Sequence, residues 1–540
     1  MLQKIPNYIK YIFTNLFLLF LFTVLFRFIF YSFFLELQNS NSSEITKAIL
    51  LGIRFDIKLA VISFFPLAIL VLSTNYTFFK KNIYRNIAKI YTVLIFLILT
   101  LFYVFDLGYY EYLEIRLDAG SLRFLSNLKI SSQVLFESYP VYKGFIGLLI
   151  LCIIMHKLSG SIYDTFVKEN QNIKKPLKII LFIVTFLTLS FGIYNSTSHY
   201  PLRWSEAFFS KNNKINQFTL NPVLYFFDSF AFRSVGVDLK KFKDYYPVIA
   251  KHLKLPKDSI NFEKKITFEE PYKDKPNVIF VMLESTGTAT MSYYGNPLKS
   301  TSKMDSLIKK SVSFSKFYVH KPGTAASVFS SITGLPDIED VKTASRNPMI
   351  INQKIIFNQY DGYEKLYFIG GSANWANIRG VFQSNIKNLK IYEEGSFEEE
   401  NRADVWGIDD YDLFKESDKV LKKLNAKQKP FVAYIQTATN HMPFTVPNKK
   451  DSFKPILEDD ITEETLLKGG FRSLGQLNGI RYLDFNVAKF LERAKVSGYY
   501  DNSIFVFFGD HRGGMKKLNF LNDNEDDIGI QVHHVPFFIH

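Results

Sequence analysis

The stretch NVIFVMLES, residues 277–285, decides the fold of the second half of the chain. Its apolar residues stand in an unbroken row before Glu284, which is typical of a strand buried on both faces of a sheet. Similar runs follow at LYFIGG (366–371), PFVAYIQT (430–437) and SIFVFFGD (503–510), and helical patterns separate them near 303–311, 325–333, 409–424 and 464–496. The alternation predicts an α/β domain over residues 276–540 with a mostly parallel central sheet.

The first 195 residues differ in composition, because five apolar segments lie there and none of comparable length follows. Most of them match the roughly 20 residues that cross a bilayer. The first is too long for the core of a secretion signal and has no small-residue cleavage site, so we expect it to be retained. The segments run approximately over 11–34, 57–74, 89–106, 142–156 and 176–194.

The sequence therefore predicts a transmembrane domain of five helices over residues 1–195, followed by juxtamembrane helices and a linker over 196–275. Two loops between the segments are basic: one has Lys80, Lys81, Arg85 and Lys89, and the other has Lys157, Lys168, Lys174 and Lys175. Basic loops stay in the cytoplasm. We therefore expect the N-terminus inside the cell and the α/β domain outside.

The net charge of +14 favours contact with anionic lipid headgroups over binding to nucleic acid. Lysines and arginines are scattered, much of the excess flanks the membrane segments, and no basic-aromatic stripe is present, so we expect no nucleic-acid partner. The only cysteine, Cys152, lies in the fourth apolar segment. This excludes a disulfide or a cysteine metal site within the chain.

Several predicted strands end in side chains that can bind a metal ion or a phosphate. Glu284 follows the first strand, His441 lies beyond the third in NHMPF, and Asp510 and His511 follow the fourth. The carboxyl ends of parallel strands meet at one edge of a sheet, and two carboxylates with an imidazole suit manganese, zinc or magnesium. Glu284 has an alternative as a helix-capping acid, and His441 as a loop residue bonded to backbone. An Asp-His pair directly after a buried strand is costly without a ligand, which favours function.

The stretch HKPGTAASVFSSITGLP, residues 320–336, places Gly323 and Thr324 before an amphipathic helical pattern. Thr324 is either the N-cap of that helix or a nucleophile that handles phosphate at the helix N-terminus. Taken alone, the stretch favours the cap, because capping is the commoner use of such a threonine.

The order of the motifs VMLES, PGTAAS, NHMPF and GDHRG resembles that of the lipoteichoic acid synthase family. GIRFD at 52–56, INQFTLNP at 215–222 and MDSLIKKSVSFSKFY at 304–318 also match, so the resemblance covers nearly the whole chain. It implies a phosphoglycerol transferase of the bacterial cytoplasmic membrane. Its sulfatase-like domain, of the alkaline phosphatase superfamily, would lie outside the membrane.

The resemblance also implies roles for individual residues. Thr324 becomes the nucleophile and a metal ligand, and Glu284, Asp510 and His511 become the other ligands of one divalent ion, typically manganese, with zinc or magnesium as alternatives. His441 matches a histidine that contacts the substrate phosphate. Trp375 and Arg379, in GGSANWANIRG, correspond to a pair that holds the glycerophosphate group, although the family's best-known members place the arginine nearer the tryptophan.

These residues imply transfer of a phospholipid-derived headgroup through a phospho-threonine intermediate. A metal-activated Thr324 would attack phosphorus, and helix amides would stabilise charge on the phosphoryl oxygens. A hydroxyl of an envelope polymer, glycan or lipid would then attack the ester. The expected partners are thus a membrane phospholipid donor and an envelope acceptor.

Alternative functions predict other sequence features. A formylglycine sulfatase needs a C/S-x-P-x-R motif, which the chain lacks. A phosphoethanolamine transferase shares five spans and a Gly-Thr nucleophile but usually has several disulfides, which a single cysteine excludes; zinc and the amine headgroup stay open. A non-catalytic sensor or scaffold would be expected to have lost Thr324 or a ligand, and all of them are present.

The sequence stops at HHVPFFIH, which has the pattern of a buried strand with no closing helix. We therefore expect truncation near the C-terminus of the domain. His533 and His534 stand where related enzymes often have a substrate or second-metal histidine. The residues alone leave open both that role and a single-metal site with exposed histidines.

Overall fold

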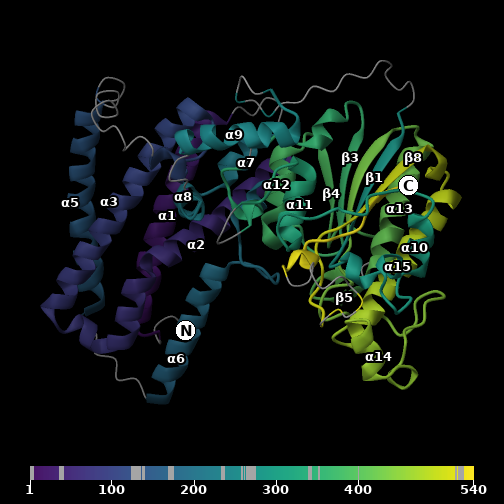
Figure 1. Ribbon diagram of the computed structural model, residues 1–540. Helices are drawn as coiled ribbons and strands as arrows, with labels where there is room; N and C mark the ends of the chain where they lie inside the picture. Colours follow the sequence, from purple (N-terminus) through teal and green to yellow (C-terminus); the bar gives the residue numbers. More distant parts are fainter. Residues whose placement is uncertain are drawn as a thin grey trace.

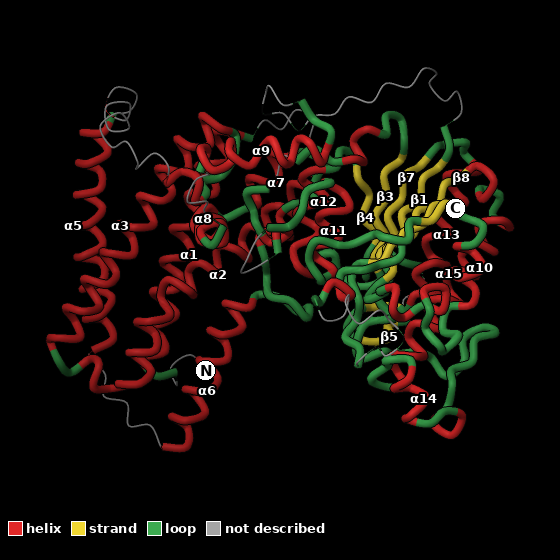
Figure 2. The backbone as a smooth tube through the Cα atoms, in the orientation of Figure 1, coloured by secondary structure: helices red, strands yellow, loops and turns green. Residues whose placement is uncertain are grey.

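The computed structural model describes residues 5–35, 42–122, 136, 140–167, 175–232, 238–256, 260, 262, 275–338, 343–350, 353–398, 401–516, 518, 520 and 528–540 of the 540-residue chain. A helical half lies beside an α/β half (Figure 1). Figure 2, with strands in yellow, places the sheet in the α/β half. Of the predicted features, Lys168, Lys174 and most of the linker before residue 275 lie outside the described residues.

Five helices of the described N-terminal residues are long and apolar enough to cross a membrane. They are α1 (Asn7–Phe34), α2 (Ser42–Thr74), α3 (Asn82–Leu113), α5 (Val141–Val167) and α6 (Lys175–Tyr194). Each contains one of the predicted apolar segments, so the prediction of a five-helix region is confirmed.

Helix α2 begins at Ser42, well before the predicted start near residue 57. Its first half carries polar side chains that bond to the connector instead of facing lipid. Glu44 accepts from Ser210 Oγ at 2.5 Å, and Arg54 donates to the Asn195 carbonyl at 2.5 Å. The apolar segment predicted at 57–74 is shorter than α2, because the helix continues beyond the predicted membrane region.

Two buried ion pairs lie within the helical half. Arg27 of α1 meets both carboxylate oxygens of Asp56 of α2, at 2.6 and 2.9 Å. Arg116, just after α3, lies 2.8 Å from Asp106. All of these side chains are at most 7% exposed. Because each charge has a partner of opposite sign, burial here leaves no isolated ion.

The connector contains a short 3-10 helix (Trp204–Ala207) and the helices α7 (Asn213–Thr219), α8 (Pro222–Phe230) and α9 (Leu239–Leu253). Both ion pairs hold it to the membrane helices. The Arg27 guanidinium donates to the Phe218 carbonyl, and that of Arg116 donates to the Gln217 carbonyl at 3.2 Å. On its other side the connector bonds to the α/β half, in the pairs Ser205–Asn377 (3.1 Å), Arg203–Asn374 (3.2 Å) and Tyr225–Pro348 (2.8 Å).

A seven-stranded sheet forms the centre of the α/β half, in the order β2-β9-β8-β1-β7-β3-β4. Its strands are β1 (Asn277–Leu283), β2 (Val312–Ser313), β3 (Glu364–Ile369), β4 (Leu389–Tyr392), β7 (Phe431–Gln436), β8 (Ser503–Gly509) and β9 (Phe537–Ile539). β8, β1, β7, β3 and β4 are parallel, whereas β9 pairs antiparallel with β8 and β2. The mostly parallel sheet is as predicted.

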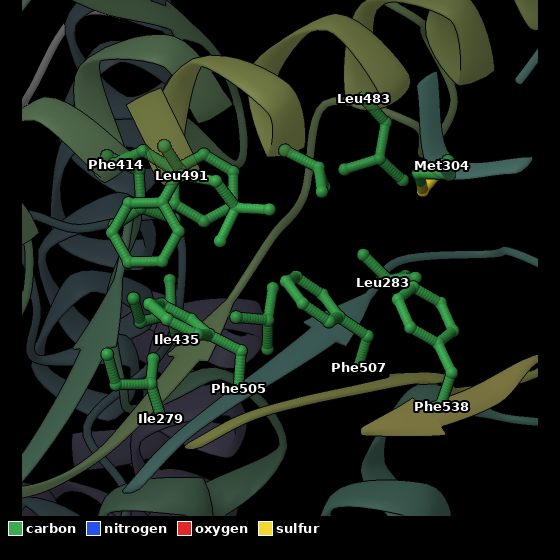
Figure 3. Close-up of a cluster of buried hydrophobic side chains, with 14 of the residues drawn as sticks. Ile279, Leu283, Met304, Phe414, Ile435, Leu483, Leu491, Phe505, Phe507 and Phe538 are labelled. Carbon is green, nitrogen blue, oxygen red and sulfur yellow. The ribbon is translucent and has the colours of Figure 1, made fainter. Parts of the chain in front are cut away.

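Helices cover both faces of this sheet. α10 (Ser302–Ile308), α13 (Asp410–Ala426) and α15 (Leu474–Val496) pack on one face, and α11 (Thr324–Thr333) and α12 (Ile378–Asn385) pack on the other. Alternate residues of β1 join the two cores: Ile279 and Leu283 the first, and Val278 and Met282 the second. Figure 3 shows the first core, where Leu483, Leu491 and Phe414 face Phe505 and Phe507 of β8.

The single helix predicted over 464–496 is wrong. The chain forms α14 (Glu463–Lys468) and α15, because Gly470 has φ of +74° and Ser473 caps the second helix with a bond to the Gln476 N–H. The strand predicted over HHVPFFIH shortens to β9, since Pro536 has no N–H to donate and the pairing with β8 covers Phe537–Ile539.

Candidate active site

The carboxyl ends of β1 and β8 bring two acidic side chains together. These strands are parallel neighbours in which Leu283 pairs with Gly509, so Glu284 and Asp510 follow at the same level of the sheet edge. His511 comes next, and ligand atoms of Glu284, Asp510 and His511 all lie within 4.8 Å of one another. The structure thus brings three of the predicted site residues into one cluster.

Both carboxylates of this cluster are buried, with 3% of Glu284 and 0% of Asp510 exposed. Asp510 Oδ1 accepts from the backbone N–H groups of Ser285 and His511 at 2.7 and 2.8 Å, while Oδ2 has no hydrogen-bond donor among the described residues. Burial, and the charge of Asp510, raise the pKa of Glu284 well above its usual value. Two buried acids side by side are costly as anions unless a cation joins them.

The imidazole of His511 is oriented by its own backbone neighbour. Nδ1 lies 3.0 Å from the Arg512 carbonyl oxygen, so it donates its proton there and leaves a lone pair on Nε2. Nε2 lies 3.3 Å from Thr324 Oγ and 3.5 Å from Asp510 Oδ2. This tautomer presents Nε2 as a ligand.

Thr324 is the first residue of α11, and Gly323 occupies the N-cap position without a side-chain cap bond. The Thr324 hydroxyl lies 3.5 Å from each oxygen of Glu284 and 3.3 Å from His511. It therefore faces the acidic cluster and not the amides of its own helix, so the capping alternative does not describe this threonine. The N–H groups of the first helical turn have no intrahelical acceptor, and this turn begins at the residue that faces the cluster.

The residues present fit a divalent cation. Two carboxylates, an imidazole with a lone pair and a hydroxyl converge, and Asp510 Oδ2 still lacks a donor. Within the described part of the chain, no lysine or arginine lies at ion-pair distance from Glu284 or Asp510. Oxygen donors with a single imidazole suit manganese, zinc or magnesium.

A cavity opens beside Glu284 and Thr324, and one part of its wall, called the aromatic wall, is formed by Tyr200, Trp375, Trp406 and His441. The ring centroid of Trp406 lies 4.5 Å from that of His441 and 6.3 Å from that of Trp375. Trp406 Nε1 donates to the Met442 carbonyl at 2.9 Å, which fixes the indole. The wall thus offers flat apolar surface next to a charged floor.

Trp375 and Arg379, a predicted pair, lie in different surroundings. Trp375 lines the cavity, whereas Arg379 is not among its lining residues. The Arg379 guanidinium donates to the Glu393 carboxylate and to Asn374 Oδ1, the latter at 2.8 Å. Arg379 therefore holds the segment that carries Trp375 and does not face Thr324.

His533 and His534, whose roles the sequence left open, bond to backbone. His533 Nδ1 lies 2.8 Å from the Val319 carbonyl, and His534 Nε2 lies 2.8 Å from the Ser315 carbonyl. The His534 ring also stacks on Tyr318, with centroids 4.6 Å apart. Neither histidine lines the cavity at Thr324.

Sequence reasoning missed Trp406 and Tyr200. Trp406 stands between β5 (Arg402–Asp404) and β6 (Gly407–Ile408), and a Cβ on Gly371 would lie 2.4 Å from its carbonyl oxygen. The two glycines of LYFIGG were thus a signal that another backbone approaches β3 there. Tyr200 comes from the connector, where no local pattern marks it.

Comparison with known proteins places the α/β half in a family. Residues 276–540 match the Sulfatase family. "Lipoteichoic acid synthase-like YvgJ" of Bacillus subtilis is 30% identical over 277 residues, which cover 49% of this chain and 42% of the relative. "Lipoteichoic acid synthase 1" of Bacillus subtilis is 27% identical over 252 residues, which cover 44% and 36%. The α/β half is thus similar in sequence to the Sulfatase family and to these lipoteichoic acid synthase relatives.

The chain spans less than half the length of the curated relatives it matches, 42% and 36% for these two. Among solved structures, the lipoteichoic acid synthase LtaP from Listeria monocytogenes matches with a TM-score of 0.41 and 21% identity, over 49% of this chain and 65% of that chain. The Sulfatase match contains Glu284, Thr324, Asp510 and His511. Tyr200 lies outside it.

Proposed function

We propose that the protein is a phosphotransferase that moves a phospholipid-derived headgroup, phosphoglycerol, to a hydroxyl of an envelope polymer, glycan or lipid. Its residues 1–195 anchor it in the bacterial cytoplasmic membrane, residues 196–275 form the juxtamembrane connector, and residues 276–540 act outside the cell. The observation that carries the proposal is the Thr324 hydroxyl, 3.3–3.5 Å from His511 and Glu284 at the floor of a cavity.

Glu284, Thr324, Asp510 and His511 would hold one divalent ion, manganese by preference, with zinc or magnesium as alternatives. When bound, such an ion supplies positive charge that lowers the pKa of a hydroxyl and neutralises phosphoryl oxygens. Glu284 and Asp510 provide the negative charge that retains it, and the Nδ1 bond of His511 keeps Nε2 turned toward it.

Thr324 Oγ would form the bond to phosphorus, and the bond from phosphorus to the diacylglycerol oxygen would break, so that the headgroup glycerol stays on the phosphate. The threonine proton passes to solvent, and the released lipid alcohol takes up a proton. The first-turn N–H groups of α11 donate to the phosphoryl oxygens. An acceptor hydroxyl then attacks the phospho-threonine in the reverse sense and frees Thr324.

The aromatic wall would orient the headgroup. His441 Nδ1 bonds to the Met442 carbonyl at 2.8 Å, which leaves Nε2 to contact the substrate phosphate. Trp375 and Trp406, which line the cavity, would contact the uncharged part of the headgroup. Arg379 contributes by holding the Trp375 segment through Glu393 and Asn374.

The test is a covalent adduct. The full-length protein in detergent, with manganese and phosphatidylglycerol labelled in its headgroup but no acceptor, should accumulate labelled phosphate on the peptide that carries PGTAAS. Thr324→Ala should lose both adduct and turnover, and Thr324→Ser should keep part of each. Thr333→Ala, at the other end of α11, is the matched control and should behave as wild type.

Two results would contradict the proposal. Wild-type turnover by a folded Thr324→Ala variant would move the nucleophile elsewhere. Label transferred from phosphatidylethanolamine but not from phosphatidylglycerol would keep the mechanism and replace the headgroup.

A further inference from the structure

A second cavity, of about 390 Å³, lies in the helical half and is separate from the one at Thr324. Its walls come from α2, α3, α8 and the connector, and most of its lining side chains are apolar: Leu59 and Ile62 of α2, Ile95, Ile98 and Leu99 of α3, and Val223 and Phe227 of α8 are examples. The volume falls within the roughly 300–1,000 Å³ of typical ligand pockets.

The cavity lies between helices that are expected to be surrounded by lipid. α2 and α3 are candidate membrane spans, and the cavity-lining residues Ile62 and Ile98 are 39% and 50% exposed in the chain. Apolar side chains that are exposed on a membrane helix face lipid. A lipid chain can therefore enter the cavity laterally without crossing water.

One end of the cavity is polar. Lys58 of α2 and Asp228 of α8 line it, and Lys58 Nζ donates to the Leu202 carbonyl at 2.6 Å. A lysine ammonium has three donors, so this bond leaves capacity for an ester oxygen of a lipid. Since lipid tails are as apolar as the cavity walls, the attraction has to come from this polar end, while the walls set the direction of a chain.

The connector joins this cavity to the catalytic one. Leu202 and Trp204 line the apolar cavity, and Tyr200 lines the cavity of Glu284 and Thr324. Even in a fully extended chain, Tyr200 and Trp204 are at most roughly 14 Å apart. A phospholipid can thus have a tail in one cavity while its headgroup reaches toward the other.

A second cation stands along this path. The Arg203 guanidinium lies 5.1 Å from the centre of the Tyr200 ring and donates to the Asn374 carbonyl at 3.2 Å. The segment is also packed tightly onto the α/β half, because a Cβ on Gly380 would lie 2.6 Å from the Trp204 ring. The connection between the two cavities is therefore fixed by contacts on both sides.

We propose that the apolar cavity binds an acyl chain of a membrane phospholipid, with the ester oxygens of the lipid toward Lys58 and its phosphate and headgroup directed along Arg203 and Tyr200 to Thr324. The proposal of a lipid site depends only on the cavity and its surroundings. Its part in supplying the donor rests on the proposed function.

The first test is photo-crosslinking of the full-length protein in nanodiscs that contain a phosphatidylglycerol with a diazirine on one acyl chain. Label should concentrate on peptides of α2, α3 and α8 that line the cavity. Ile98→Trp, which fills the cavity, should lower this labelling several-fold. Leu94→Trp is the matched control, because Leu94 is 48% exposed on the same helix and does not line the cavity.

Equal labelling of these peptides in the Ile98→Trp and Leu94→Trp variants would overturn the proposal. Lys58→Met is a second variant that keeps the volume and removes the charge. It too should lower labelling, and unchanged labelling would show that Lys58 does not contribute to lipid binding.

The second test separates this site from the proposed function. For Ile98→Trp, KM for a long-chain phosphatidylglycerol should rise about tenfold relative to KM for a short-chain, water-soluble one, the equivalent of about two methylene contacts. If wild type transfers neither donor but the cavity still crosslinks, the proposed function fails and the lipid site stands. If both donors are transferred and the KM ratio is unchanged, the cavity does not supply the donor.

Discussion

The helical half and the α/β half both bury charged side chains, but they surround them differently. In the helical half, Arg27 meets Asp56 and Arg116 meets Asp106. In the α/β half, Glu284 and Asp510 lie together with His511, and among the described residues no lysine or arginine lies at ion-pair distance from either acid. Paired charges already neutralise each other, whereas neighbouring acids favour a cation.

The two kinds of buried charge therefore have different roles: one is structural, and the other is available to bind a cation. The paired charges also bond to carbonyls of the connector, so they hold residues 215–222 to the membrane helices. The two acids have no lysine or arginine partner among the described residues, and Asp510 Oδ2 has no hydrogen-bond donor there. GIRFD and INQFTLNP are therefore structural motifs, while VMLES and GDHRG carry the proposed chemistry.

The largest expected effect comes from breaking one of the paired charges. Asp56→Ala leaves Arg27 buried without its partner and should cost about 3–5 kcal/mol. Thermal unfolding of the detergent-solubilised full-length protein measures it. The double variant Arg27→Met/Asp56→Leu should recover most of the loss, and a loss as large in the double variant would contradict the pairing argument.

A smaller loss is expected from crowding the same ion pair. A Cβ on Gly52 would lie 2.5 Å from the Arg27 guanidinium, which four hydrogen bonds to Asp56, Gly52 and Phe218 hold in place. Gly52→Ala should therefore cost about 1–3 kcal/mol. Gly147→Ala is the control, because a Cβ there meets nothing within 4 Å and alanine favours the helix. Equal melting temperatures for the two variants would argue against a tight site at Gly52.

Asp484 is a third kind of buried acid, whose carboxyl group has only backbone N–H groups as hydrogen-bond donors among the described residues. It accepts from the N–H groups of Met304 and Lys303 at 2.6 and 3.2 Å, yet burial raises its pKa to about 7. Because the folded pKa exceeds the unfolded value of 3.8, its contribution to stability is full below about pH 4 and is lost as the pH rises through about 7.

Asp484→Asn should therefore flatten the fall in melting temperature between these pH values, with a cost of about 1 kcal/mol at the acid end for one lost acceptor. Melting curves of wild type and variant across that pH range measure both effects. The same slope in both proteins would assign the pH dependence to other groups.

The sequence predicted those features of the fold and site that depend on local pattern. The strands β1, β3, β7 and β8 were apolar runs, whereas β2 and β4 were not predicted, and the parallel order placed Glu284, Asp510 and His511 at one edge. The break at Gly470 was missed because the helical period continues on both sides of it. Tyr200 and the Glu393 partner of Arg379 were out of reach, because both depend on contacts between distant segments.

The most direct test of the contrast between paired and unpaired buried charge is the melting temperature of wild type and Asp510→Asn, each with chelator and with manganese. Asparagine Oδ1 keeps the two backbone bonds of Asp510 but removes a charge beside Glu284. With chelator, the variant should melt higher than wild type, by roughly 1–2 °C for each 1 kcal/mol of repulsion removed. Manganese should raise the melting temperature of wild type and leave the variant unchanged. A variant that melts lower than wild type in chelator, together with a wild type that does not respond to manganese, would contradict the account.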